Sequence, residues 1–272
     1  MKRLAIFTSF FAAAALTVPA FAQSGTTDSS TKISGVASKD VAAGMDDPNS
    51  PFEKNNQTYR FVGARFRYII IPQFYMGLFG SGGTTVGVPA FGPEFTIRKN
   101  GFEYVLSAMY ASYAMDPTPF KAKTDGADAW EIVDTDVKTL YLMSDFLWSA
   151  EMSPKASFLY GAGFGIAAVF GDIHRVQAMP ANGNVTSDPY TWVACPRPGA
   201  FSTCMNDNNH YGNYTEPSWA NGGSKPFIFP WISLPQLSLR IKPVKQFETR
   251  LDLGFSITGF FFGMNAGYAL PL

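Results

Sequence analysis

Hydrophobic and polar residues alternate along most of the chain from Thr58 onward, and such alternation predicts β-strands. In residues 59–71, apolar side chains occupy the even positions, while Gly63, Arg65 and Arg67 occupy odd ones. The same pattern recurs in residues 88–98, 102–113, 139–148, 156–170, 236–241, 247–257 and 260–270. The sixth of these eight stretches is short, so we expect that strand to begin near Phe227. Most stretches reach the ~9–11 residues that a tilted strand needs to cross a bilayer. The pattern predicts an all-β fold, a closed up-and-down antiparallel transmembrane β-barrel of about eight strands.

The connections between these stretches alternate in length. Those at 71–88, 114–135 and 171–226 are long, and those at 98–102, 149–155 and 242–246 are short. One end of the predicted barrel therefore holds short turns and the other holds large loops, as in outer-membrane barrels. The last connection, at Thr258-Gly259, is tight where the pattern requires a long loop.

The size of an eight-stranded barrel indicates which face points outward. Its interior is just wide enough for side chains to fill, and large rings would overfill it. A soluble, lipocalin-like barrel turns its apolar face inward and needs a charged exterior. Here the polar face carries small residues suited to a crowded interior, namely Gly63, Gly92, Gly161, Gly163, Gly165, Gly254, Gly263 and Gly267. We therefore expect lipid against the aromatic face and a lumen lined by the polar face.

Five arginines and five carboxylates lie on the predicted lumen face. They are Arg65, Arg67, Arg98, Arg240 and Arg250, with Glu94, Glu103, Asp145, Glu248 and Asp252. Arginine keeps its charge when buried and binds carboxylates with planar geometry, whereas isolated buried charges are costly. We therefore expect an ion-pair network in a polar lumen. For Arg98 and Glu248, near strand ends, solvation at the periplasmic rim is an equal alternative.

The charge balance argues against nucleic acid as a partner. The chain has 21 Lys+Arg and 21 Asp+Glu, and only 15% of its residues are charged while 15% are aromatic. Nucleic-acid binding requires a strong basic excess. Soluble domains average about 25% charged residues, so the composition indicates a surface that does not face water everywhere.

The first residues have the three parts of a secretory signal. Lys2 and Arg3 precede an apolar run, and Ala20-Phe21-Ala22 forms a small-x-small cleavage site. We expect residues 1–22 to be a cleaved signal peptide, since the run is too short for a membrane-spanning helix. Residues 23–56 are polar and aperiodic, which predicts a flexible N-terminal tail. Residues 57–272 form the predicted barrel.

The connection at 171–226 is the most individual part of the sequence. It contains Cys195 and Cys204, which we expect to form a disulfide in an exported chain. A zinc site would need more ligands than two Cys and two His supply. Five aromatic residues are candidates for surface recognition: Tyr190, Trp192, Tyr211, Tyr214 and Trp219. A solvated loop without a dedicated partner is the equal alternative.

Catalytic motifs give no support for an enzyme. Asp172 stands near His174, which suits an oriented general base, but Val176 occupies the position where a matching serine would stand. The sequence has no Gly-x-Ser-x-Gly and no phosphate-binding glycine loop on a strand-to-helix turn. We therefore expect no catalytic residues, no cofactor and no metal.

Several of these features together resemble a known group of proteins. The signal peptide, the eight alternating stretches, the Arg98-Lys99-Asn100-Gly101 turn and the C-terminal Gly267-Tyr268-Ala269-Leu270 are similar to the small outer-membrane β-barrels of Gram-negative bacteria. These include the OmpA transmembrane domain, opacity-type surface proteins and OmpW-like barrels. The resemblance covers about residues 58–272.

The resemblance implies export to the bacterial outer membrane, contact with its lipid and lipopolysaccharide, and insertion by the barrel-assembly machinery. Such barrels usually end in an aromatic residue, whereas this chain ends Leu270-Pro271-Leu272. The function expected is a non-enzymatic structural or surface-interaction role. Two alternatives are a narrow channel for small or apolar solutes and a lipid-modifying enzyme.

Overall fold

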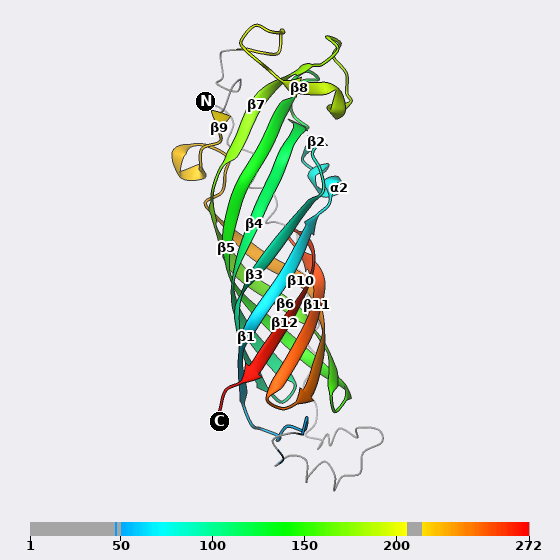
Figure 1. Ribbon diagram of the computed structural model, residues 1–272, viewed down its shortest axis with the longest axis vertical. Coiled ribbons are helices and arrows are strands. Elements are labelled where there is room, and N and C mark those ends of the chain that lie inside the picture. The colour runs from blue at the N-terminus through cyan, green and yellow to red at the C-terminus, as the bar shows by residue number, and fades with distance from the viewer. Residues whose placement is uncertain (1–46, 48–49, 206–213, 272) are drawn as a thin grey trace, which may run out of the picture. The chain divides into compact units, whose positions relative to one another are not determined.

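Eight antiparallel strands follow one another around a closed ring in which the first pairs with the last (Figure 1). Their bounds are β1 Tyr59–Ile71, β3 Val86–Lys99, β4 Phe102–Ala122, β5 Glu131–Ser153, β6 Ala156–Phe170, β10 Ile228–Val244, β11 Phe247–Ser256 and β12 Gly259–Ala269. Ring order equals chain order, so this is the predicted up-and-down barrel. The computed structural model describes residues 47, 50–205 and 214–271. The predicted signal peptide, residues 23–46 of the predicted tail, and Tyr211 lie outside the described residues.

The two faces of the ring strands are those that the alternation predicts. In β1, Arg65 and Arg67 are buried inside the ring. Phe66, which stands between them in the sequence, and Val62 are exposed on the outer side of the ring. The exposed apolar side chains of the ring include Leu106, Leu140, Leu142, Trp148, Phe158, Tyr160, Phe164, Ile166, Leu239, Leu251, Leu253, Phe262 and Met264. The outer face is therefore apolar over most of the strand length.

Short turns gather at the end of the ring where the chain terminates (Figure 1). The turn between β3 and β4 consists of Asn100 and Gly101, which adopt φ of 50° and 78°. Both values are left-handed, which is the geometry that a two-residue hairpin requires and that Asn-Gly favours. The tight turn predicted at this position is confirmed.

Beyond the opposite end of the ring, β4 and β5 continue as a pair, because they have 21 and 23 residues. On this pair β2 (Gly80–Gly82) adds to β4, and β7 (Ile173–Pro180) adds to β5. Two further strands pair with β7, β8 (Trp192–Ala194) and β9 (Tyr214–Thr215). We call residues 114–135 and 171–226, which carry most of these strands, the strand extension.

The prediction of a loop at 114–135 is therefore wrong for most of its length, whereas the connection at 171–226 contains β7, β8 and β9 between stretches without strands. The side chains of residues 131–135 are all half-buried, with no buried and exposed sides to alternate between. A strand whose two faces are both partly exposed to solvent does not need alternating polar and apolar residues, and this alternation is the pattern by which sequence analysis recognises a strand.

Three short helices complete the described residues: α2 (Gln73–Met76) and two 3₁₀ turns, η1 (Pro189–Thr191) and η2 (Trp219–Asn221). Among the described residues, no helix is long and apolar enough to cross a membrane.

Partway along β10, the side chains that point into the ring change from odd-numbered to even-numbered positions. Its pairing with both neighbours shifts register between Ser233 and Gln236. Trp231 and Ser233 before the shift, and Gln236 and Arg240 after it, all lie buried inside the ring. The alternation predicted for residues 236–241 is the part after the shift, and the strand begins at Ile228, close to the predicted Phe227.

Candidate functional site

All ten residues expected in a lumen network lie inside the ring, and each is at most 4% exposed. They come from β1, β3, β4, β5, β10 and β11. The structure brings all ten into one connected set of ion pairs, which extends from the middle of the ring toward its short-turn end. Arg98 and Glu248 are buried as well, so the alternative of solvation at the rim does not describe them.

Arg65, on β1, lies at the centre of the network and meets three carboxylates. Its Nε is 2.5 Å from Glu94 Oε2, and its Nη1 is 2.6 Å from Asp145 Oδ2. Its Nη2 is 3.5 Å from Asp252 Oδ2. These partners stand on β3, β5 and β11, so one guanidinium joins four strands. A buried arginine with several carboxylate partners keeps its charge and its orientation.

Arg250, on β11, binds the same region from the other side. Its Nη2 donates to both carboxylate oxygens of Glu94 at 3.0 Å, and its Nε donates to Asp252 Oδ1 at 2.9 Å. Its Nη1 reaches Glu103 Oε2 on β4 at 3.4 Å. Glu94 and Asp252 therefore each bridge Arg65 and Arg250. Such sharing offsets the cost of burying several charges together.

Toward the short-turn end, Arg98 extends the network to the segment before β1. It pairs with Glu103 at 3.2 Å, with Glu248, and with Glu53 at 2.5 Å. Lys242 on β10 also pairs with Glu53, at 3.0 Å. Glu53 belongs to the segment predicted as a tail, and nothing in its sequence context distinguishes it. Burial raises the pKa of Glu53, but the positive charges of Arg98 and Lys242 outweigh it and hold that pKa below its usual value.

The network contacts side chains on every ring strand. Arg240 on β10 binds Glu103, and it binds Glu151 at 2.8 Å and Ser157 Oγ at 2.6 Å. Ser157 stands on β6 and Asn265, which donates to Glu94, stands on β12. With the residues above, all eight ring strands take part. The network therefore ties the strands to one another across the lumen in addition to their backbone pairing.

Arg67 marks the limit of the charged part of the lumen. Its Nη2 is 3.2 Å from Asp145, and its guanidinium lies over the Phe261 ring at 4.4 Å. From there toward the strand extension a cluster of buried apolar side chains occupies the lumen, with Thr139 as a buried polar neighbour. Its members are Ile69, Val86, Val88, Ala90, Met109, Ala111, Tyr141, Met143, Ala167, Trp231 and Phe261. The charged side chains of the lumen therefore lie in the half nearest the short turns, which also contains a small buried apolar cluster of Val105, Leu147 and Leu159.

Rings fill this apolar half of the lumen. Tyr141 packs edge-on against Trp231 with 4.9 Å between centroids, and Trp231 contacts Phe261 at 6.3 Å. Tyr113 and Tyr141 join their hydroxyl groups by a hydrogen bond. Sequence alternation misses this layer because Phe260, Phe261 and Phe262 are consecutive, and because Trp231 precedes the register shift of β10.

A second, smaller ion cluster stabilises the strand extension. Arg175 on β7 pairs with Glu131 on β5 and with Glu216, at 3.0 Å for the second. Glu216 also accepts hydrogen bonds from the Ser224 backbone N–H and hydroxyl, both at 2.7 Å. Burial raises the pKa of Glu216, but these hydrogen bonds and Arg175 outweigh it and lower that pKa below its usual value. The cluster joins β5, β7 and the chain after β9.

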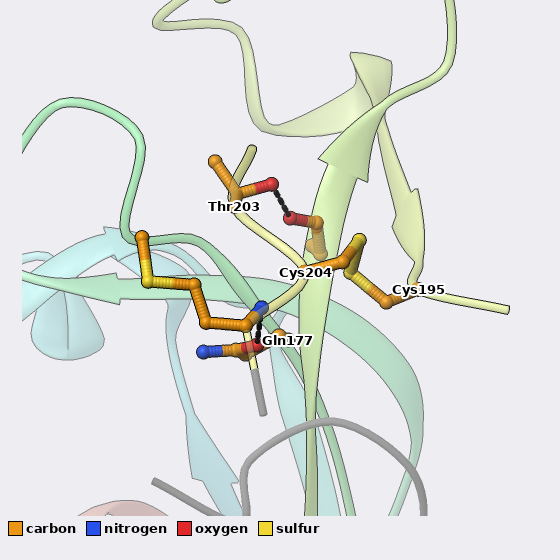
Figure 2. Close-up of a disulfide and its surroundings, with 6 residues drawn as sticks. Gln177, Cys195, Thr203 and Cys204 are labelled. Carbon is orange, nitrogen blue, oxygen red and sulfur yellow. Dashed lines mark hydrogen bonds between the residues drawn. A yellow bond between two sulfur atoms is a disulfide. The ribbon is translucent and has the colours of Figure 1, made fainter. Parts of the chain in front are cut away.

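The disulfide expected between Cys195 and Cys204 is present, with an S–S distance of 2.02 Å. Figure 2 shows that Thr203 and Gln177 lie beside it. The Thr203 hydroxyl donates to the Ala178 carbonyl at 2.8 Å, and the Gln177 side-chain oxygen accepts from the Met205 backbone N–H at 2.8 Å. The Gln177 carbonyl accepts from the Cys195 N–H. The crosslinked loop is therefore fastened to β7.

The five aromatic recognition candidates differ in exposure. Tyr190 is 76% exposed and Trp219 is 43% exposed, whereas Tyr214 is half-buried. Trp192 is only 3% exposed: it packs against Trp130 with 6.0 Å between centroids and donates its indole N–H to the Thr186 carbonyl. Trp192 therefore belongs to the core of the strand extension, and its assignment as a surface contact is wrong. Tyr211 lies outside the described residues.

No protein-family model matches this chain, and no curated protein matches it in sequence. Among solved structures, the chain is similar to Neisserial surface protein A (NspA), with 7% identity and a TM-score of 0.38 over 78% of this chain and 97% of that one. It is also similar to Ail, the attachment invasion locus protein of Yersinia pestis, with 10% identity and a TM-score of 0.36 over 80% and 100%. For a structure of Ail in complex with the heparin analogue sucrose octasulfate, the identity is 11% and the TM-score is 0.34, again over 80% of this chain and 100% of that one.

Proposed function

We propose that this chain is a non-enzymatic outer-membrane β-barrel with a closed lumen and a structural or surface-interaction role. The observation that carries the proposal is the arginine–carboxylate network, which crosses the lumen and contacts every ring strand. A membrane barrel whose interior is filled by paired charges and packed apolar side chains is a rigid support. Its function then lies in the parts that it holds at the membrane surface.

The outer face of the ring supports a membrane location. Exposed leucine, isoleucine and phenylalanine side chains such as Leu253, Phe164 and Ile166 cover it, and monomeric soluble proteins rarely expose so continuous an apolar surface. A hydrocarbon environment removes this cost, and closure of the ring leaves no unpaired strand edge in lipid. The long-connection end then faces the outside of the cell.

The strand extension supports a surface-interaction role. It is built from β4, β5 and β7, crosslinked by the disulfide and held by the Arg175 ion pairs. On this support Tyr190 and Trp219 expose large rings. Aromatic side chains presented by a rigid scaffold are a common recognition surface, because little conformational entropy is lost when they bind. Lipopolysaccharide around the barrel and the barrel-assembly machinery are the further partners that this location requires.

Cell fractionation tests the location, and lipid analysis tests the absence of enzymatic activity. The full chain, expressed in a Gram-negative host, should be found in the outer-membrane fraction and should require detergent for extraction. Its expression should leave the lipid A mass spectrum unchanged. Protein that stays folded in buffer without detergent would contradict the membrane assignment. A new lipid A species would support the lipid-modifying enzyme instead.

A further inference from the structure

The connection between β1 and β3 lies at the long-connection end of the ring and is unusually apolar. No residue from 68 to 93 is Asp, Glu, Lys, Arg or His. Within it, Phe74, Leu78 and Phe79 are 66%, 57% and 51% exposed. We call these three residues the rim patch. Connections that face water are normally polar, so an uncharged connection with three exposed large apolar side chains needs a partner.

The same connection has a buried side that fixes it to the mouth of the ring. Met76 packs against the apolar cluster that fills this half of the lumen. The Gln73 backbone N–H donates to Thr85 Oγ1 at 3.1 Å, and its side chain donates to the Gly83 carbonyl at 3.0 Å. The Gly83 N–H donates in turn to Pro119 on β4. The exposure of the rim patch therefore belongs to a segment held in place by the barrel.

A row of rings joins the rim patch to the outer face of the barrel. Phe79 contacts Tyr75 at 6.3 Å, Tyr75 contacts Phe255 at 6.4 Å, and Phe255 contacts Phe260 at 5.2 Å between centroids. The Tyr75 hydroxyl donates to the Ile257 carbonyl at 2.7 Å. Phe260 is exposed on the outward side of β12. The rim patch is thus continuous with the surface that faces lipid in the proposed function.

The tight turn between β11 and β12 makes this arrangement possible. β11 ends at Ser256 and β12 begins at Gly259, whose φ is 140°. A side chain there would bring its Cβ within 2.2 Å of the Ile70 carbonyl oxygen, so glycine is required. Because the connection between β11 and β12 is only a short turn, the β1–β3 connection can pack over it. This explains the one short turn at the end that otherwise carries long connections.

We propose that the rim patch inserts into the outer leaflet of the membrane and contacts lipid acyl chains. The inference rests on the proposed function, because it requires the ring to span the outer membrane with the strand extension outside. Three observations favour lipid as the occupant: the absence of charge, the continuity with the lipid-facing surface, and the aromatic rings. Aromatic and aliphatic side chains at the edge of a spanning segment are typical of the bilayer interface.

Spin labels in reconstituted protein test the inference. Leu78→Cys carries the label at the rim patch, and Phe79→Cys is a second reporter if the first variant fails to fold. Val185→Cys is the matched control, because Val185 is an equally exposed aliphatic residue on the strand extension. Phe164→Cys reports the middle of the outer face. Each variant of the full chain is reconstituted in phosphatidylcholine–phosphatidylglycerol vesicles, and accessibility to oxygen and to a water-soluble nickel chelate is measured.

The label at position 78 should resemble that at 164, with oxygen reaching it at least several-fold more readily than the chelate, while the label at 185 shows the reverse. If position 78 behaves like 185 while 164 remains in lipid, the inference is overturned and the proposed function stands. If 164 is itself open to the chelate, both are overturned. Spin–spin broadening at 78 that disappears on dilution with unlabelled protein would assign the patch to a second copy, which also overturns the inference.

Discussion

Arg250 on β11 contacts Glu103 on β4, although these strands stand four places apart in the ring of eight (Nη1–Oε2, 3.4 Å). No two strands of such a ring can be further apart, so this single contact spans the lumen. Arg250 also binds Glu94 and Asp252. Removal of this one side chain therefore takes one cationic partner from carboxylates on three strands, β3, β4 and β11.

We predict that Arg250→Ala destabilises the barrel by about 3–5 kcal/mol, which is the usual cost of breaking a buried ion pair. Arg60→Ala is the matched control, because Arg60 lies exposed at the beginning of β1, and it should change stability by no more than about 0.5 kcal/mol. Urea unfolding in lipid vesicles, followed by tryptophan fluorescence, measures both. Equal stabilities for the two variants would show that the network contributes nothing.

The apolar outer face predicts a different response to charge. Leu253→Arg places a cation at the middle of β11 on the outward side, which should cost about 2–4 kcal/mol in the bilayer and reduce the yield of inserted protein. Leu253→Phe keeps the position apolar and should insert normally. The measurement is the folded fraction after vesicle insertion. Similar insertion of both variants would mean that Leu253 does not face lipid.

Substitution of the neighbouring Gly254 should act through the interior. A Cβ at this position would lie 2.5 Å from the Pro235 carbonyl oxygen and 2.6 Å from the Phe261 ring. We therefore expect Gly254→Val to lower the stability of the folded barrel, although valine is apolar and suits lipid. Urea unfolding compares it with Leu253→Val on the outward side. A Gly254→Val barrel as stable as the wild type would contradict the assignment of this face to the interior.

The disulfide should stabilise only the strand extension. Cys195→Ser with Cys204→Ser removes a crosslink worth at most about 3 kcal/mol for so short a loop. We expect faster hydrogen exchange in β7, where Gln177 and Ala178 hold the loop, and in β8, which pairs with it. Exchange in β11 and β12 should be unchanged. Loss of protection throughout the ring would show that the crosslink supports the whole barrel.

Acid should release the segment before β1 from the barrel. The pKa of Glu53 lies below its usual 4.5, because Arg98 and Lys242 outweigh the effect of burial. A lowered pKa in the folded state gives stability that is complete above about pH 4.5 and is lost as the pH falls through the folded value. A spin label at Asn55→Cys should therefore gain mobility in acid. In a Glu53→Gln background, the mobility of this label should not change over that range; an unchanged acid response would rule out Glu53 as the group responsible.

The ring itself follows from the sequence, because each of its strands has one outward apolar side and one interior side. The period of two in residues 59–71 places Arg65 and Arg67 inward, where the structure has them. The ten charged residues of the lumen are found in the same way. Their individual partners do not follow, because a contact such as Arg250–Glu103 depends on ring order and shear rather than on spacing along the chain.

Some parts of the fold could not be predicted from the alternation of polarity. In these parts the chain has no single buried side, or it has two. Residues 131–135 are half-buried throughout, so the continuation of β5 beyond the ring resembles a loop. Trp192 stands among polar loop residues, and only the packing of Trp130 against it shows that it is core. Phe261 is an inward ring between two outward ones, which no alternation of polarity distinguishes. Glu53 acquires its role only through the fold.

Single-channel recording is the most direct test of the closed lumen. Wild-type protein in a planar bilayer at neutral pH should conduct little, because paired charges and the aromatic layer of Tyr141, Trp231 and Phe261 occupy the interior. Arg250→Ala in the same bilayer should conduct more, since it removes the side chain that spans the lumen. A large and steady wild-type conductance that Arg250→Ala leaves unchanged would contradict the closed lumen and favour a channel for small or apolar solutes.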